Sequence, residues 1–209
     1  MQLNRESALS RAVALATRGQ RAILGITGAP AAGKSTYAEQ LTAELVADGH
    51  QVVLLPMDGY HLAQSALEEL GLAAVKGAPQ TFDGYGFVAL LKRLKDSPDE
   101  TIWAPRFDRS IEDSIAASIP VRPETTLVVT EGNYLLFDQA PWATGRALLD
   151  ECWYIDLDDN LRHERLEARH QRFGRSPEEA HARTYGSDEA NAQLIAATKP
   201  NADAIITLT

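Results

Sequence analysis

The sequence predicts an α/β fold in which helices cover both faces of a parallel sheet. Short apolar runs that fit buried strands alternate along the chain with longer segments of helical spacing. A glycine-rich loop follows one of these runs, and a carboxylate follows each of two later runs. Strands that alternate with helices form parallel sheets, whose ligands bind at the carboxyl ends of the strands. We therefore expect a ligand site at that edge of the sheet.

The glycine-rich loop, Gly28–Thr36, matches the GxxxxGK[ST] phosphate-binding pattern at every fixed position. We expect a strand at Ala22–Thr27 before it and a helix at Tyr37–Asp48 after it, with Leu41, Leu45 and Val46 on one side. This context predicts a P-loop NTPase, a three-layer αβα sandwich with a parallel sheet of about five strands. Lys34 would bring a positive charge to the β/γ-phosphates, and Ser35 would bring a hydroxyl to Mg²⁺. The expected ATP-binding residues of the loop are Gly28, Ala29, Pro30, Ala31, Ala32, Gly33, Lys34, Ser35 and Thr36.

The remaining elements are predicted from the same patterns. Residues 3–16 fit a short amphipathic helix, and residues 71–86, rich in glycine and proline, fit a loop on the substrate side. Further strands are expected at 51–55, 101–104, 126–129, 151–155 and 204–208, and further helices at 62–70, 87–94 and 158–173. Ser176, Pro177 and Glu179 mark a strong helix start, with Ser176 as the N-cap.

The composition narrows the classes of partner. A net charge of −9 over 209 residues argues against nucleic acid and acidic membrane surfaces. The sequence has no apolar run of about 18 residues and no leader-like N-terminus, so we expect a cytoplasmic protein without membrane insertion. The one cysteine, Cys152, lies in an apolar run and is expected in the core.

Two carboxylates are expected at the ligand edge of the sheet. Asp58 follows the strand at 51–55, and Glu131 follows the strand at 126–129. Phosphoryl transfer needs one acidic group that organises Mg²⁺ and another that orients or deprotonates the acceptor hydroxyl. The alternatives are a helix cap for Asp58 and a structural turn for Glu131. His61 is an alternative base.

Four arginines recur at helical spacing and would share one helix face: Arg162, Arg165, Arg169 and Arg172. Asp158 can pair with Arg162, whereas the other three have few acidic partners at i±4. Unpaired guanidiniums on one face suit a transferring phosphoryl group. The alternative is a solvated basic surface, and Arg172 is the weakest candidate of the four.

These motifs, in this order, resemble the phosphoribulokinase, uridine kinase and type I pantothenate kinase group of P-loop kinases. The matching segments are Gly28–Thr36, Pro56–His61, Lys76–Asp83, Pro105–Arg109, Glu131–Leu136, Arg162–His170 with Gly174, Asp188–Asn191 and Asn201–Ile205. MDGYH at 57–61 and EGNYLL at 131–136 narrow the resemblance to bacterial proteins named as fructose transport system kinases. The strand end carries Glu131 where the general Walker pattern has aspartate, a departure that the group shares.

The resemblance implies an ATP-dependent kinase that uses Mg²⁺ and phosphorylates a small molecule with a hydroxyl group. It implies one domain, 1–209, with an acceptor-side segment at about 59–109 and a helical lid with its following helix at about 158–190. Arg165 and Arg169 would lie on the lid over the ATP phosphates and act with Asp58 and Lys34 as the catalytic residues. Asn201, Ala202 and Asp203 match the region that lies near the adenine.

The resemblance also implies the metal and acceptor sites. Ser35 and Glu131 are the expected Mg²⁺ ligands, with contact to the acceptor as the alternative for Glu131. The expected acceptor site comprises Asp58, Tyr60, His61, Phe82, Asp83, Arg106, Arg109, Glu131 and Tyr134. For its aromatic members, and for Tyr85, packing in the core or at the rim is the alternative.

The predicted function is transfer of the γ-phosphoryl group of ATP to a hydroxyl of a small metabolite, a sugar such as fructose. A nucleoside and pantothenate are the alternative acceptors, and a homodimer is common in this group. A regulatory nucleotide-binding ATPase is the alternative of another class. The sequence contains neither the NKxD motif of GTPase switches nor the LSGGQ motif of ABC-type ATPases.

Overall fold

A six-stranded parallel sheet runs through the middle of the molecule, and the computed structural model describes residues 1–208. The strand order is β1-β8-β7-β2-β6-β3. These strands are β1 (Gln2–Leu3), β2 (Ala22–Thr27), β3 (Val52–Pro56), β6 (Leu127–Glu131), β7 (Glu151–Asp156) and β8 (Ala204–Thr207). Glu131 pairs in register with Ile26 on one side and Pro56 on the other, so the carboxyl ends of β2, β6 and β3 meet at one edge.

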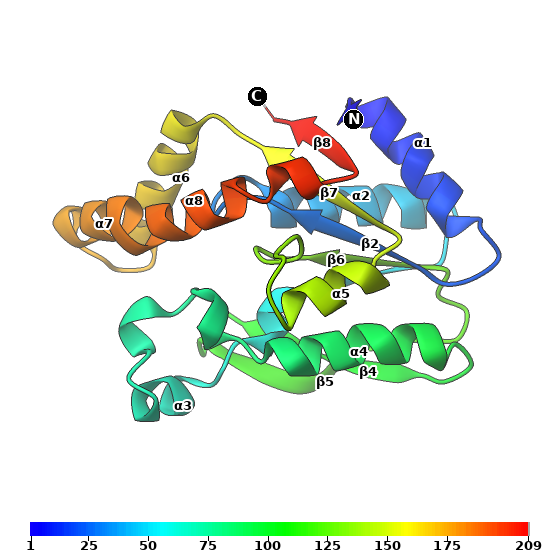
Figure 1. Cartoon of the computed structure of the whole chain (residues 1–209), viewed down its shortest axis with the longest axis horizontal. Coiled ribbons are helices and arrows are strands. Elements are labelled where there is room, and N and C mark those ends of the chain that lie inside the picture. Colours follow the sequence, from blue (N-terminus) through cyan, green and yellow to red (C-terminus); the bar gives the residue numbers. More distant parts are fainter. Residues whose placement is uncertain (209) are drawn as a thin grey trace.

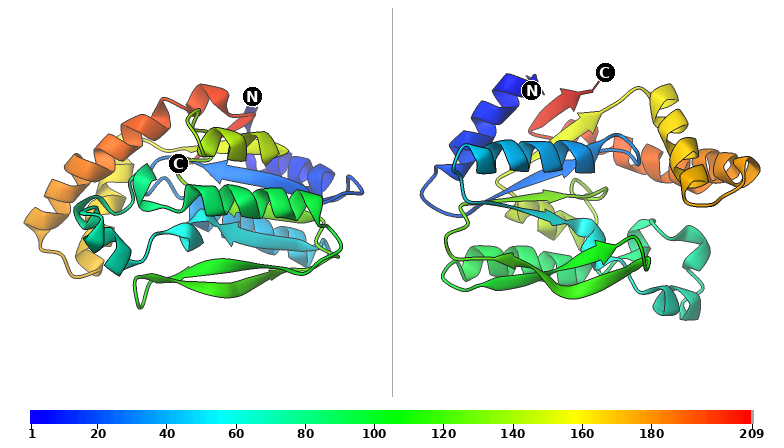
Figure 2. Two further views of the ribbon diagram at one scale, coloured as in Figure 1. Left: turned by 60° about the horizontal axis from the view of Figure 1, so that its bottom comes forward. Right: turned by 180° about the vertical axis from the view of Figure 1, so that it is seen from behind.

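Helices cover both faces of the sheet, as Figures 1 and 2 show. Helices α1 and α2 pack on one face, and α4 and α5 pack on the other. The helices are α1 (Arg5–Ala16), α2 (Lys34–Ala47), α3 (Gln64–Glu69), α4 (Gly84–Asp96), α5 (Trp142–Leu148), α6 (Asp159–Arg172), α7 (Pro177–Arg183) and α8 (Glu189–Ala196). No helix within residues 1–208 is both long enough and apolar enough to cross a membrane.

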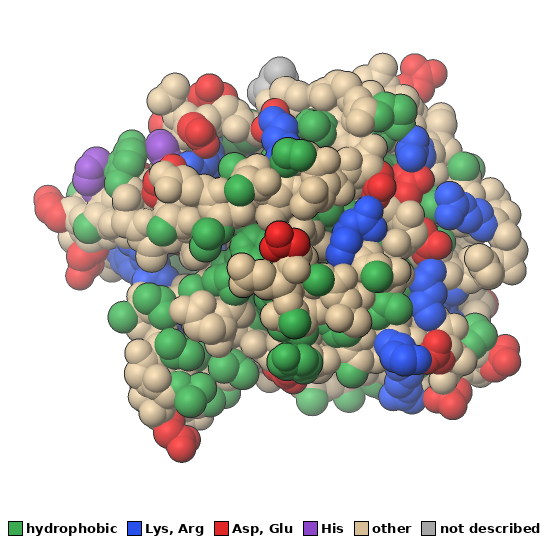
Figure 3. Space-filling view, viewed as in Figure 1, with side chains coloured by type: hydrophobic (Ala, Val, Ile, Leu, Met, Phe, Trp, Pro, Cys, Tyr) green, Lys and Arg blue, Asp and Glu red, His purple; other side chains and the backbone are tan. Residues whose placement is uncertain are grey.

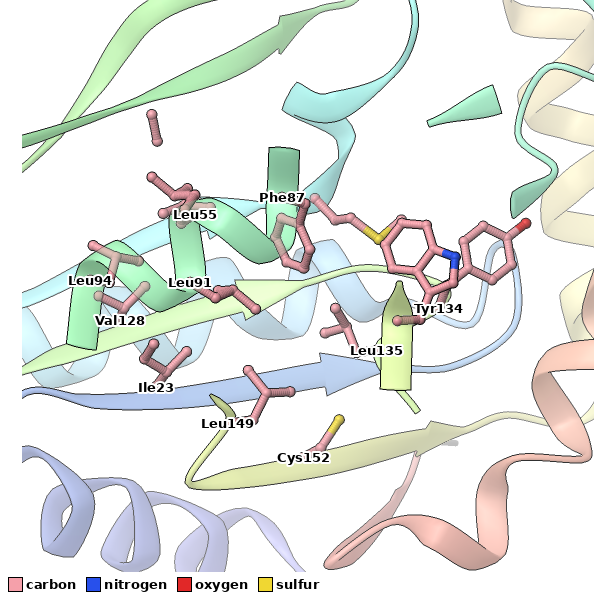
Figure 4. Close-up of a cluster of buried hydrophobic side chains, with 14 of the residues drawn as sticks. Ile23, Leu55, Phe87, Leu91, Leu94, Val128, Tyr134, Leu135, Leu149 and Cys152 are labelled. Atoms are coloured by element: carbon pink, nitrogen blue, oxygen red, sulfur yellow. The ribbon is translucent and has the colours of Figure 1, made fainter. Parts of the chain in front are cut away.

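Two hydrophobic clusters, one on each face of the sheet, form the core. Figure 4 shows the cluster beneath α4, in which Phe87 and Leu91 lie with the strand residues Ile23 and Val128. Cys152 belongs to this cluster, as the sequence predicts, and burial raises the pKa of its thiol. The alternation of strand and helix is therefore held by apolar side chains on both faces.

A two-stranded antiparallel hairpin, β4 (Ile102–Asp108) and β5 (Asp113–Val121), packs on the short helical turn Met57–Tyr60 that follows β3. Asp108 pairs with Asp113, so residues 109–112 form the hairpin tip. The sequence predicts only the first part of β4 and no strand at 113–121. The middle of β5 is made of small exposed residues, and it therefore lacks the apolar run that marks a buried strand.

The predicted α/β fold with a parallel sheet is confirmed. The sheet has six strands rather than about five because the two-residue strand β1 pairs with β8 at its edge. The placement of Val46 on the buried side of α2 is wrong: its side chain is 51% exposed. Ala38, Leu41 and Leu45, which follow one another at helical spacing, form that side instead.

Helices α6, α7 and α8 lie at the edge of the sheet where the strands end, with α3 below them in Figure 1. The predicted capping box at Ser176 is present, with its side chain accepting from the Glu179 N–H. Asp158 caps α6 and does not pair with Arg162, which corrects the expectation from the sequence. Arg162 instead pairs with Asp159 and with Glu189 of α8.

Candidate active site

The loop Gly28–Thr36 turns tightly between β2 and α2. A Cβ on Gly28 would lie 2.5 Å from the Ile155 carbonyl oxygen, so only glycine fits against β7 at this point. Gly33 has φ +94° and caps the start of α2 from the left-handed region, which glycine adopts without strain. The N–H groups of the first turn of α2 therefore face the loop, and such groups together with the helix dipole bind anions.

Lys34 lies over this loop. Its side chain is buried, and its Nζ donates to the Ala29 carbonyl at 3.2 Å. Burial lowers the pKa of Lys34, although the charges of Glu131 and Asp58 oppose that shift. A buried ammonium beside two carboxylates at the mouth of an anion-binding loop can hold the phosphates of a nucleotide.

Glu131 ends β6 directly beside the loop. Ser35 Oγ donates a hydrogen bond to Glu131 Oε1 at 3.0 Å, and the Glu131 side chain is buried. Burial, followed by the nearby charge of Asp58, raises the pKa of Glu131 to about 7, while Lys34 and Ser35 act in the opposite direction. A hydroxyl and a carboxylate that share one hydrogen bond form the oxygen donor pair that suits Mg²⁺.

Asp58 lies in the turn Met57–Tyr60, at the same edge of the sheet. Its Oδ2 is 3.3 Å from Arg109 Nη2 of the hairpin tip, and its Oδ1 is 3.9 Å from His61 Nε2. The structure therefore brings Asp58, Glu131 and Lys34 together, as the sequence predicts for three separate strand ends.

An aromatic wall, formed by His61, Phe82 and Phe107, borders Asp58 on the acceptor side. The His61 ring stacks on Phe82 with centroids 3.9 Å apart and is tilted against Phe107 at 5.1 Å. His61 Nδ1 has no hydrogen-bond partner within residues 1–208. Burial lowers the pKa of His61, although Asp58 opposes the shift, so the ring is a poor proton acceptor at neutral pH.

The four arginines of α6 do not share one environment. Arg162 is buried in its ion pairs, whereas Arg165, Arg169 and Arg172 are exposed. Arg165 Nη1 would lie 3.7 Å from a Cβ on Gly33, so Arg165 is beside the phosphate loop. Arg169 lies within electrostatic reach of Asp58 and Arg109. The structure therefore brings Arg165 and Arg169 to the site, and Arg162 serves to hold α6 on α8.

Asn201, Ala202 and Asp203 are not brought to the phosphate loop. They directly precede β8, whose first residue, Ala204, pairs with Trp153 of the neighbouring strand β7. Asp203 accepts from the Cys152 N–H and from Arg146 Nη2 at 2.8 Å, which holds it in a structural role. The side chains that lie nearest to Gly33 come instead from Arg165 and from Leu208, which follows β8.

Several predicted acceptor residues also lie elsewhere. Asp83 is exposed and caps α4 by accepting from the Gly86 N–H at 2.8 Å. Tyr60 packs edge-on against Phe87, and Tyr85 is 72% exposed. Tyr134 is fully buried in the core, where its hydroxyl donates to the Gly77 carbonyl.

Arg106 points away from the site. Adjacent strand residues face opposite sides, and Phe107 faces His61, so Arg106 lies on the outer face of the hairpin beside the exposed Ile115. Gly59 lies directly against the hairpin, because a Cβ there would lie 2.5 Å from the Pro105 carbonyl oxygen. This glycine lets the hairpin pack closely on the turn that carries Asp58.

Sequence reasoning missed three residues around the wall: Phe107, Glu112 and Arg183. Lys76 Nζ lies over the Phe107 ring and donates to the Glu112 carbonyl at 3.0 Å, and Arg183 of α7 donates to the Lys76 carbonyl at 3.0 Å. These contacts join the loop around Lys76 to the hairpin and to α7. These contacts join residues that are far apart in the sequence, so no local sequence pattern predicts them.

Comparison with known proteins adds relatives of the whole chain. The "Putative uridine kinase C227.14" of Schizosaccharomyces pombe is 33% identical over 194 residues, which cover 89% of this chain and 83% of that protein. The crystal structure of a "putative fructose transport system kinase" from Silicibacter sp. TM1040 superposes with a TM-score of 0.86 and 37% identity, covering 97% of this chain and 98% of that one.

Two further comparisons support only the fold or only part of the chain. The crystal structure of YFH7 from Saccharomyces cerevisiae has a TM-score of 0.83 over 99% of both chains, but at 18% identity it shows the fold alone. The family described as methylmalonyl-CoA mutase-associated GTPase MeaB matches residues 2–63. That segment holds β1, β2, β3 and the phosphate loop, and it stops before the hairpin and helices α6 to α8.

Proposed function

Because the chain belongs to the uridine kinase-like family of P-loop kinases, we propose that it transfers the γ-phosphoryl group of ATP to a hydroxyl group of a small metabolite. The acceptor that we favour is a sugar such as fructose. The name of the Silicibacter protein supports this choice, since that chain matches along almost its full length.

The observation that carries the proposal is the position of two carboxylates beside a complete phosphate loop. Glu131 accepts from Ser35 inside the loop region, and Asp58 lies farther out, next to the aromatic wall. A nucleotide-binding protein that only hydrolyses or senses ATP has no need for a second carboxylate on an acceptor-side wall. A kinase needs both groups, because one serves the nucleotide and the other serves the acceptor.

The residues divide the reaction between them. The loop and Lys34 would hold the β- and γ-phosphates, with Arg165 and Arg169 of the lid above them. Asp58 would hold the acceptor hydroxyl in line with the γ-phosphorus. The acceptor oxygen forms a bond to that phosphorus while the bond to the bridging oxygen of ADP breaks, and the bond's electron pair stays on ADP. The hydroxyl proton passes to Asp58.

Ser35 and Glu131 would hold Mg²⁺, which offsets the negative charge of the phosphates when it is bound. Their hydroxyl and carboxylate oxygens are the donor types that this ion prefers, and their hydrogen bond already aligns them. On this assignment Glu131 serves the nucleotide and Asp58 serves the acceptor.

A nucleoside is the second candidate acceptor. The half-buried rings of His61 and Phe107 lie on the side of Asp58, and aromatic rings of this kind stack on a nucleobase. The name of the Schizosaccharomyces relative agrees with a nucleoside acceptor. Pantothenate is the third candidate, on the resemblance of the motifs.

An acceptor panel tests the proposal. ADP release would be followed with fructose, uridine or pantothenate present, and the mass of the product would identify the phosphorylated species. We expect one acceptor to accelerate ADP release strongly, and Lys34→Ala to lower that rate by about 10²–10³-fold. If ATP is hydrolysed at the same slow rate whatever hydroxyl compound is added, the protein is a nucleotide-binding ATPase and not a kinase.

A further inference from the structure

The hairpin tip places a cation directly on the proposed base. Arg109 Nη2 lies 3.3 Å from Asp58 Oδ2. The tip is anchored, because Lys76 Nζ donates to the Glu112 carbonyl at 3.0 Å and lies 3.6 Å from the Glu112 carboxylate. The Lys76 carbonyl in turn accepts from Arg183 of the lid. The Arg109 guanidinium is thus held over the cleft by the acceptor-side segment and by α7.

A second guanidinium approaches the same carboxylate from the lid. Burial and then the charge of Arg109 lower the pKa of Arg169 of α6, while Asp58 opposes the shift, so Arg169 lies within electrostatic reach of both residues. Within residues 1–208, Arg169 makes no ion pair with a carboxylate. Figure 3 shows basic side chains beneath α7, facing the hollow between the lid and the α3 region. Asp58 is the carboxylate that acts on both Lys34 and Arg169, while Glu131 also acts on Lys34.

We propose that Arg109 is a catalytic residue that binds the transferring phosphoryl group opposite Arg169. The inference rests on the proposed function and adds a new role for a residue that the sequence assigns to the acceptor. A transferring phosphoryl group spreads negative charge over its equatorial oxygens, and planar guanidiniums bind such oxygens in pairs. An anion between Arg109 and Arg169 therefore relieves their repulsion.

The same exchange frees the base. The Arg109 guanidinium donates to Asp58 Oδ2, one of the two oxygens that could accept the hydroxyl proton. When Arg109 moves from Asp58 to the phosphoryl group, Asp58 loses its ion pair and can take the hydroxyl proton. The hairpin thereby links arrival of the phosphoryl group to activation of the base.

Arg106 supplies a matched control. It lies in β4, three residues before Arg109, and it carries the same charge. Its side chain is on the outer face of the hairpin, away from Asp58. Arg106→Ala removes an arginine from the hairpin without touching the cleft.

Calorimetric titration separates the roles without requiring the acceptor to be known. Mg·ADP would be titrated alone and with aluminium fluoride, which mimics a phosphoryl group in transfer, into the wild type, Arg109→Ala and Arg106→Ala. We expect aluminium fluoride to tighten Mg·ADP binding to the wild type by about 10²-fold or more. Arg109→Ala should lose most of this gain yet bind Mg·ADP alone within about threefold of the wild type, and Arg106→Ala should keep the gain.

Each other result is decisive. If Arg109→Ala keeps the full gain, Arg109 does not bind the phosphoryl group, and the inference fails while the proposed function stands. If Arg109→Ala and Arg106→Ala lose the gain equally, the effect belongs to the charge or stability of the hairpin, and the inference also fails. If the wild type shows no gain, the proposed function itself fails, and the inference fails with it.

Discussion

The Ser35 hydroxyl donates a 3.0 Å hydrogen bond to the Glu131 carboxylate and so joins the start of α2 to the end of β6. Burial and the charge of Asp58 raise the pKa of Glu131 to about 7. The protein without Mg²⁺ therefore holds a proton on Glu131 through much of the range below neutral pH. Metal binding at this carboxylate must release that proton.

This proton makes stability depend on pH. The folded pKa of about 7 lies above the ordinary value of 4.5, so the folded state binds the proton more tightly between these values. The stabilisation is complete below the lower value and is lost as the pH rises through the higher one. We expect the free energy of unfolding of metal-free protein to fall by up to about 1.4 kcal/mol per pH unit in this window from this group.

Glu131→Gln should remove that contribution. Urea unfolding in the presence of a chelator, measured from pH 5 to pH 8 at intervals of about half a unit, would give the slope for both proteins. The variant should show a flatter profile and should gain stability relative to the wild type as the pH rises. Parallel profiles would mean that Glu131 keeps an ordinary pKa in the folded protein.

A second prediction concerns Arg162, which holds α6 on α8. Its buried side chain pairs with Asp159 at 2.9 Å and with Glu189. Burial acts to raise the pKa of Glu189, but hydrogen bonds from His163 and Arg162 outweigh it and lower that pKa to about 2. Arg162→Ala should lower stability by on the order of 3 kcal/mol, because it leaves a carboxylate without its main partner.

The exposed Arg172 on the same helix is the control for Arg162. Arg172→Ala should change the free energy of unfolding by less than about 0.5 kcal/mol. Denaturant unfolding and limited proteolysis of the lid would compare the two variants. Equal stability of both variants would show that the Arg162 ion pairs contribute little.

Most of the fold could be predicted from the sequence, because its strands are fully buried apolar runs. The predicted bounds of β2 are those that the structure shows, and those of β7 differ by one residue at its end. The hairpin could not be predicted in full, since β5 buries only its last part and is held by pairing with β4. Strand pairing of this kind depends on contacts that a single run does not display.

The sequence predicts correctly the position of those site residues that the sheet topology alone determines. Lys34, Asp58 and Glu131 follow from strand ends in a parallel sheet. The residues that were predicted from the segments on the acceptor side were placed less accurately, because adjacent residues of a strand point to opposite faces. Phe107 points toward His61, whereas Arg106 points to the outer face of the hairpin. The catalytic roles of the residues that converge remain predictions, and substitution of each residue tests its role.

The lid arginines should affect the rate more than ground-state binding. Arg165 lies beside Gly33, and Arg169 lies within electrostatic reach of Asp58, so both can bind the phosphoryl oxygens more strongly in the transition state than in the ground state. Arg165→Ala and Arg169→Ala should lower kcat by about 10²-fold or more while ADP affinity falls less. Steady-state kinetics and ADP titration would measure both quantities. A loss of ADP affinity equal to the loss of kcat would mean that these residues bind the nucleotide uniformly.

Substitution of the proposed base tests the central claim most directly. Asp58→Asn keeps the shape of the side chain and removes its charge. The decisive measurement is the rate of phosphoryl transfer by this variant at saturating Mg·ATP. Calorimetry on the same protein would give its affinity for Mg·ATP. We predict near-native Mg·ATP affinity and a rate at least about 10²-fold lower. Weakened Mg·ATP binding would instead make Asp58 a metal ligand. A native rate together with native affinity would contradict the proposed role of Asp58, because acceptor chemistry would then lie elsewhere than at the end of β3.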